Sequence, residues 1–170
     1  MSDIVKLSSF EQRITALDSS GNLSTYSFDP KITGNTVFNI KKAGITDFCI
    51  LSPTIYAYST TNSLQVVDSL LHPKRQCVFK LNMSQQPQCI ESLLESKIVV
   101  CRKTDLQIYD IRMDIQESTR DITLNNTNNT SSTNTTRPKC ICSNHKNKVL
   151  VGRNDGRVRV VDYNDKDKDY

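Results

Sequence analysis

The amino-acid sequence predicts an all-β protein made of about four blades of a β-propeller. Two observations lead to this fold class: pairs of strands with alternating apolar residues are joined by tight turns, and these pairs recur at a nearly constant interval. The first apolar residues after the turns are Leu23, Leu64, Leu106 and Val158, which are separated by steps of 41, 42 and 52 residues. A period of about 40–45 residues with a hairpin in each repeat is typical of propeller blades.

The long last step is explained by the composition of one segment. Residues 125–136 are all Asn, Thr or Ser, and without these twelve residues the step is 40. Such a segment has too little apolar surface to form a packed core. We therefore predict that residues 125–136 form a disordered insertion between the third and fourth blades.

The fourth hairpin shows the repeat most clearly. Alternating apolar residues at 148–152 and 158–163 flank the turn sequence Asn154-Asp155-Gly156. Gly156 adopts the positive φ of a tight hairpin turn without steric cost. The alternation on both sides of the turn predicts that one face of this hairpin packs against a core.

The other elements follow from the same pattern of short strands separated by turn residues. We expect blades at about residues 3–42, 43–82, 86–124 and 137–163, followed by a solvated tail at 164–170. The expected strands are 4–8, 12–18, 23–28 and 36–41; 45–51, 55–59, 64–68 and 76–81; 88–93, 97–102, 106–111 and 120–124; and 138–142, 148–152 and 158–163. The fourth blade therefore has three predicted strands, because the sequence after Tyr163 is strongly charged.

The composition predicts a single domain in the nucleus or the cytoplasm. The chain has 170 residues and a net charge of +4, and no apolar run approaches the ~20 residues that a membrane-spanning helix needs. Its first residues lack the apolar region of a secretory signal. We therefore expect the six cysteines to be reduced, small core residues of strands. Only Cys140 and Cys142 are close in sequence, and no second pair lies at the spacing of a zinc site.

The sequence contains no arrangement of residues that predicts catalysis. Its two histidines, His72 and His145, are far apart and fall in predicted loops. No nucleophile elbow, phosphate-binding glycine loop or metal cluster is present. We therefore expect a protein that is not an enzyme and that requires no cofactor or metal.

The predicted number of blades raises a question about the ends of the structure. Closed propellers have four to eight blades, and an open half-ring leaves two apolar faces exposed. Three explanations remain open: the chain is half of a seven-bladed propeller, it pairs with another half, or the fold is a smaller β-sandwich. We favour a half-propeller that is completed by a second copy, by a different chain or by a continuation of the chain.

The basic residues gather at one end of the predicted blades. Turns between second and third strands share this end with the connections between blades, which also hold Lys41 and Lys42, and Asp105 and Asp155 oppose the cations there. The other turns hold Glu11, Asp29, Glu91, Glu95, Asp114 and the acidic tail, offset by Lys31, Lys74, Arg75 and Arg112. The predicted partner-binding residues at the basic end are Arg102, Lys103, Arg137, Lys139, Arg153 and Arg157. We hypothesise that this end binds an acidic peptide, with Arg102, Arg153 and Arg157 making charge-assisted hydrogen bonds. The alternative is that they are scattered charges that serve solubility.

The segments after the turns resemble the third strand of a WD-repeat blade. They read Leu64-Gln65-Val66-Val67-Asp68, Leu106-Gln107-Ile108-Tyr109-Asp110 and Val158-Arg159-Val160-Val161-Asp162. The first repeat departs from the pattern because Ser27 replaces the aspartate, and the chain contains no tryptophan. The resemblance implies degenerate WD repeats and a protein-interaction scaffold.

Residues 88–162 also resemble the spindle-checkpoint and mRNA-export WD-repeat propellers. The resemblance rests on an Asp-apolar-Arg unit at 110–112, the strand Lys139-Cys140-Ile141 and the turn Gly156-Arg157-Val158. It implies a non-enzymatic adaptor whose basic side chains bind a short Glu-containing motif of a checkpoint kinase or nucleoporin. Members of that family are expected to have seven blades and about twice this length.

Two other functions remain as alternatives to the scaffold. A nucleic-acid-binding or phosphate-binding subunit would use the same basic end, and its affinity would depend steeply on salt. Few aromatic residues accompany the basic loops, so no surface for base stacking is predicted. A non-catalytic subunit of a modifying enzyme would co-purify with a catalytic chain.

Overall fold

The computed structural model describes residues 3–27, 36–41, 44–94, 96–113, 118–124, 137–144 and 146–163. These residues form fifteen strands in four antiparallel sheets, and their only helical element is the short 3-10 helix η1 (Pro73–Arg75). The all-β prediction is therefore confirmed. The predicted insertion at 125–136 and the predicted tail at 164–170 lie outside the described residues.

Each sheet is built from consecutive strands that pair in chain order. Blade 1 contains β1 (Ile4–Phe10), β2 (Arg13–Asp18), β3 (Asn22–Ser27) and β4 (Thr36–Lys41), and blade 2 contains β5 (Ile45–Ile50), β6 (Ile55–Thr60), β7 (Ser63–Asp68) and β8 (Cys77–Asn82). Blade 3 contains β9 (Cys89–Leu94), β10 (Lys97–Cys101), β11 (Asp105–Asp110) and β12 (Arg120–Thr123), and the described part of blade 4 contains β13 (Pro138–Ser143), β14 (Lys148–Arg153) and β15 (Val158–Asp162).

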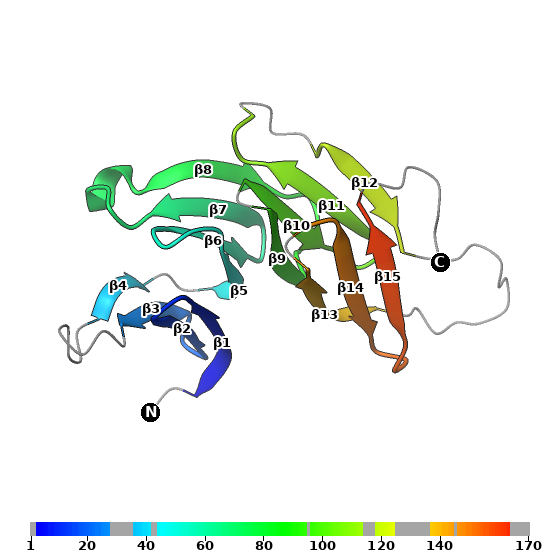
Figure 1. Ribbon diagram of the computed structural model, residues 1–170, viewed down its shortest axis with the longest axis horizontal. Helices are drawn as coiled ribbons and strands as arrows, with labels where there is room; N and C mark the ends of the chain where they lie inside the picture. The colour runs from blue at the N-terminus through cyan, green and yellow to red at the C-terminus, as the bar shows by residue number, and fades with distance from the viewer. Residues whose placement is uncertain are drawn as a thin grey trace, which may run out of the picture.

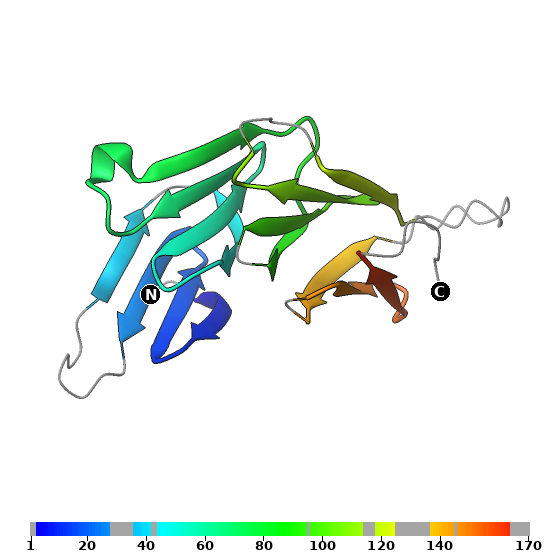
Figure 2. The ribbon, with the colours of Figure 1, turned by 45° about the horizontal axis from the view of Figure 1, so that its top comes forward.

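The four sheets follow one another like four blades of a β-propeller (Figure 1). The first strands of successive sheets contact each other, β1 with β5, β5 with β9 and β9 with β13. The remaining strands of each sheet follow outward in order. In both views, blade 1 and blade 4 lie at opposite ends of the series (Figures 1 and 2).

The tight turns have the predicted chemistry. Gly156 has a φ of +78° between β14 and β15, and its N–H donates to the carbonyl of Arg153 at 3.2 Å. Gly21 has a φ of +80° between β2 and β3, where the Asp18 carboxylate accepts hydrogen bonds from the backbone N–H groups of Ser20 and Asn22, both at 2.9 Å. Glycine therefore supplies the left-handed residue in the β2–β3 turn of blade 1 and in the β14–β15 turn of blade 4.

Three apolar cores hold the blades together, one at each junction. We call the side of a blade that faces the next blade its forward face, and the side that faces the previous blade its rear face. The forward face of blade 1 and the rear face of blade 2 bury Leu17, Leu23, Phe38, Ile45, Phe48, Ile50, Tyr56, Tyr58 and Val67. The junction of blades 2 and 3 buries Cys49, Leu51, Ala57, Leu64, Val66, Leu81, Met83, Ile90, Ile98, Val100 and Tyr109. The junction of blades 3 and 4 buries Cys89, Leu93, Val99, Cys101, Leu106, Ile108, Ile122, Leu124, Val149, Val151 and Val161.

One buried carboxylate joins three blades. Asp47, on β5, accepts a hydrogen bond from Lys6 Nζ of blade 1 at 2.6 Å through Oδ1. Its Oδ2 accepts from the backbone N–H of Ile90 on blade 3 at 2.8 Å. Because the carboxylate is only 8% exposed, both bonds compensate for its removal from water. Asp47 therefore fixes the relative positions of the first strands of blades 1, 2 and 3.

The expectation that all six cysteines are core residues is wrong for half of them. Cys49, Cys89 and Cys101 are buried, whereas Cys77, Cys140 and Cys142 are exposed. Cys77 lies on β8, the outermost strand of its blade, and the other two lie on the forward face of blade 4. Strand alternation predicts which side a residue takes, but it does not predict whether another sheet covers that side.

Candidate functional site

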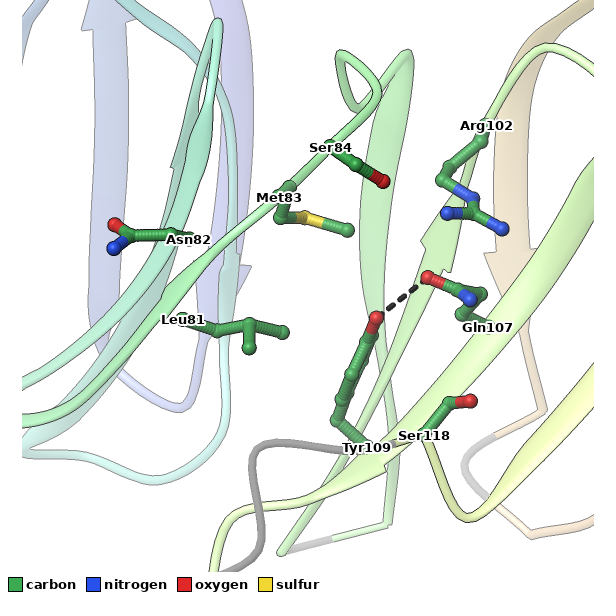
Figure 3. A pocket seen from close by; sticks show the side chains of 8 residues that line it. All are labelled: Leu81, Asn82, Met83, Ser84, Arg102, Gln107, Tyr109 and Ser118. Atoms are coloured by element: carbon green, nitrogen blue, oxygen red, sulfur yellow. Dashed lines mark hydrogen bonds between the residues drawn. The ribbon is translucent and has the colours of Figure 1, made fainter.

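A pocket of about 350 Å³ lies between blades 2 and 3. Blade 2 contributes the end of β8 and the residues after it, and blade 3 contributes β11 with the segments on either side of that strand. The pocket is lined by Leu81, Asn82, Met83, Ser84, Arg102, Gln107, Tyr109 and Ser118. Figure 3 shows Leu81 and Met83 on one side of the pocket and Arg102 and Gln107 on the other.

A chain of hydrogen bonds forms the polar wall of this pocket. Tyr109 Oη donates to Gln107 Oε1 at 2.5 Å (Figure 3). Gln107 Nε2 donates to Asp121 Oδ1 at 3.1 Å. Ser118 Oγ donates to the same oxygen of Asp121. Burial raises the pKa of Tyr109 to about 12, so the phenol keeps its proton at neutral pH. The hydrogen bonds therefore fix the positions of Tyr109, Gln107 and Ser118 in the wall.

Arg102 stands at the edge of the pocket and is held by a local carboxylate. Its Nε donates to Asp105 Oδ1 at 3.1 Å and its Nη2 donates to Asp105 Oδ2, and both side chains are 14% exposed. The hydrogen bonds to Asp105 raise the pKa of Arg102 above its already high ordinary value. The pairing occupies the Nε and Nη2 edge of the guanidinium, while Nη1 carries two further N–H donors. Arg102 is thus a positioned hydrogen-bond donor whose charge is largely compensated.

Blade 4 brings three of the predicted site residues together. The N–H of Arg137 donates to Asn154 Oδ1 at 2.7 Å, and the N–H of Asn154 returns a bond to the carbonyl of Arg137 at 2.9 Å. The N–H of Arg153 donates to the carbonyl of Arg157 at 2.9 Å. The start of β13 therefore lies beside the β14–β15 turn, as the propeller prediction requires.

The predicted cations differ in how much of their charge reaches the solvent. Arg153 Nη2 lies 3.7 Å from Asp155 Oδ2, and the arginine side chain is 18% exposed. Like Arg102, Arg153 is therefore mostly covered and paired with an aspartate. The remaining four cations have exposed side chains: Lys103, Arg137, Lys139 and Arg157. We call the end of blades 3 and 4 that carries all six predicted cations the basic end. The exposed members give this end its positive character, because both of the less exposed arginines have an acidic neighbour.

The aspartates of the repeat pattern have a structural role. Asp110 accepts from the N–H of Arg112 at 3.1 Å and from its guanidinium Nε and Nη2 at 3.0 and 2.7 Å. These hydrogen bonds lower the pKa of Asp110. Asp68 accepts from the N–H of Leu70 at 3.0 Å, and Asp162 accepts from Asn147 Nδ2 at 3.2 and 3.3 Å. Each carboxylate therefore stabilises a turn near the end of a third strand.

The structure adds two findings about absent features. Among the residues that the structure describes, no group of three or more His, Cys, Asp or Glu side chains is placed to hold a metal ion. No helix within the described ranges is long and apolar enough to cross a membrane. Of the two histidines, His72 caps η1, and His145 lies outside the described residues.

The polar wall of the pocket was not predicted from the sequence. Tyr109 and Gln107 are two residues apart on one strand, so they lie on the same face, and this spacing is visible in the sequence. A related contact occurs in blade 2, where Tyr58 Oη donates to Gln65 Oε1 at 2.8 Å. The glutamine directly after the first apolar residue of both third strands, Gln65 and Gln107, was a usable indication of a buried hydrogen-bond partner.

No protein-family model matches this chain, and no curated protein matches it either. The structure supports four antiparallel sheets in a propeller arrangement. The kind of repeat and its function are therefore argued from the residues alone.

Proposed function

We propose that this protein is a non-enzymatic interaction scaffold of the WD-repeat type that binds an acidic linear segment of another protein at the basic end. The observation that supports the proposal is the placement of Lys103, Arg137, Lys139 and Arg157 as exposed cations at one end of two packed sheets. Rigid sheets present such side chains in a fixed arrangement, which lowers the entropy lost on binding. A checkpoint or mRNA-export partner is the form of this proposal that the family resemblance favours.

The pocket beside Arg102 suggests how an acidic segment would be oriented. Arg102 and Gln107 are polar groups on one wall, whereas Leu81 and Met83 are apolar groups on the other. A segment with a carboxylate next to an apolar side chain matches both walls. The exposed cations then contribute long-range attraction, which increases the association rate and makes the affinity sensitive to salt.

The proposal is tested with a labelled peptide that contains six glutamates and a matched peptide that contains six glutamines. We expect the glutamate peptide to bind and the glutamine peptide not to bind. The double variant Lys103→Glu with Arg157→Glu should weaken binding of the glutamate peptide by about tenfold, since two attractive contacts become repulsive. These two residues are exposed, so the substitutions leave the Arg102–Asp105 and Arg153–Asp155 pairs in place.

A matched control reverses two exposed charges at a different place. Lys74 and Arg75 lie in η1, between the third and fourth strands of blade 2, and both are exposed. Lys74→Glu with Arg75→Glu changes the net charge by the same amount but should leave peptide affinity within about twofold. If both double variants lose the same peptide affinity, the effect comes from net charge alone and the proposed site is wrong. Tighter binding of a single-stranded oligonucleotide than of the glutamate peptide would favour the nucleic-acid alternative instead.

A further inference from the structure

The forward face of blade 4 is an exposed apolar sheet surface. Val158 is 63% exposed, and Val160 and Leu150 are each 40% exposed. Leu150 pairs directly with Val160 and with Cys142, so these three side chains form one row across the sheet. A contiguous apolar surface of this kind marks an interaction site in a folded protein.

The repeat shows what covers this face in the other blades. Val158 and Val160 occupy the same places after the hairpin turn as Leu23 and Thr25 in blade 1, Leu64 and Val66 in blade 2, and Leu106 and Ile108 in blade 3. Those six residues are at most 1% exposed, and the five apolar ones belong to the cores against the next blade. Blade 4 thus has the residues of a buried junction at the corresponding positions.

The next row of blade 4 is shaped for close contact. Cys140, Gly152 and Val158 pair across the sheet in that order. A Cβ atom on Gly152 would come within 2.6 Å of Cys140 Sγ. Glycine therefore leaves room for the Cys140 thiol to lie across β14.

The rear face of blade 1 shows the complementary feature. Val5 is 60% exposed, Leu7 is 58% exposed and Tyr26 is 43% exposed. The position of Tyr26 in the repeat is taken by Val67, Tyr109 and Val161 in the later blades, where the residue is at most 5% exposed. In those blades it lies against the forward face of the blade before it.

We propose that two copies of this chain form a closed ring in which the forward face of blade 4 packs on the rear face of blade 1 of the other copy. Each copy offers one face of each kind at opposite ends of its series of blades, so one dimer makes two identical junctions. The new junctions repeat the packing already seen at the three junctions within the chain. The resulting ring has eight blades, which lies within the range of closed propellers, four to about eight.

The test measures the mass of the 170-residue chain in solution by light scattering, at concentrations from about 1 to 100 µM. We expect twice the 19.3 kDa of one chain, without growth at the highest concentration, because the closed ring leaves no free end. A monomer over the whole range would overturn the proposal. A mass that rises continuously would also overturn it, because open head-to-tail assembly would then have replaced closure.

Two substitutions separate this geometry from other dimers. Val160→Asp damages only the forward face of blade 4, and Leu7→Asp damages only the rear face of blade 1. The dimer dissociation constant of each single variant should rise at least tenfold, since every junction in its dimer contains one damaged face. In a mixture of the two variants one junction of each mixed dimer is intact, so mixed dimers should exceed either homodimer.

Circular dichroism verifies the fold of each variant, and Val158→Lys replaces Val160→Asp if the latter does not fold. Leu70→Asp is the matched control, because Leu70 is 78% exposed and lies outside both faces. If Val160→Asp dissociates the dimer but Leu7→Asp does not, the proposed pairing of unlike faces is wrong. The charge reversals that test peptide binding involve neither face, so the two proposals can fail separately.

Discussion

Truncation of Leu64 to alanine tests whether stacking between blades holds this fold together. Leu64 is fully buried in the junction of blades 2 and 3, beside Val66 and Leu81 of its own blade and the apolar residues of blade 3. The substitution removes three carbon groups, which at about 0.8 kcal/mol each gives a transfer cost near 2.4 kcal/mol. The remaining cavity adds to this, so we expect Leu64→Ala to lower the free energy of unfolding by about 2.5–4 kcal/mol.

The measurement is urea unfolding followed by circular dichroism at one fixed protein concentration. Leu70→Ala is the matched control, since it is the same chemical change in the same blade at a side chain that is 78% exposed. The control should change the unfolding free energy by less than about 0.5 kcal/mol. If Leu64→Ala costs no more than the control, the blades do not depend on their junctions and the reasoning from buried faces fails.

Two further predictions concern groups inside the blades. Burial raises the pKa of Tyr58 and Tyr109 to about 12 from an ordinary value of 10.0, so the folded state holds these protons more tightly than the unfolded state. Their contribution to the free energy of unfolding is complete below pH 10 and falls as the pH rises from about 10 to 12. Urea titrations at several alkaline pH values measure this fall, and the double variant Tyr58→Phe with Tyr109→Phe should make it smaller. Gly156→Ala should lower the free energy of unfolding by about 1–2 kcal/mol, because alanine is strained at a φ of +78°. The melting temperature should fall accordingly, and an unchanged value would contradict this conformation.

Much of the fold could be predicted because its information is local. Alternating apolar residues on both sides of Asn154-Asp155-Gly156 define a hairpin within sixteen residues, 148–163, and the same pattern occurs three more times in the chain. The strand boundaries were close for this reason; β1, for example, continues to Phe10 where the prediction ended at residue 8. Local patterns do not report contacts between blades. The bond between Lys6 and Asp47 joins residues 41 positions apart, and nothing near either residue predicts it.

The candidate site was predictable in its position but less so in its electrostatics. All six predicted cations are found near the expected turns or at the start of β13. The sequence also contained Asp105 and Asp155, but only the structure shows that they pair with Arg102 and Arg153. The burial of the cysteines was harder to predict, because Cys140 and Cys142 occupy the apolar face of a strand whose sheet comes last in the series.

The connectivity of the sheets has a consequence for synthesis on the ribosome. Each blade consists of consecutive strands, so its backbone hydrogen bonds are complete soon after its last strand leaves the exit tunnel. A nascent blade can therefore settle on the one made before it, and the chain can fold vectorially from its N-terminus. The two hydrogen bonds of Asp47 form in a fixed order during synthesis, because the bond from Lys6 can form first and the bond from Ile90 only after Ile90 has been translated.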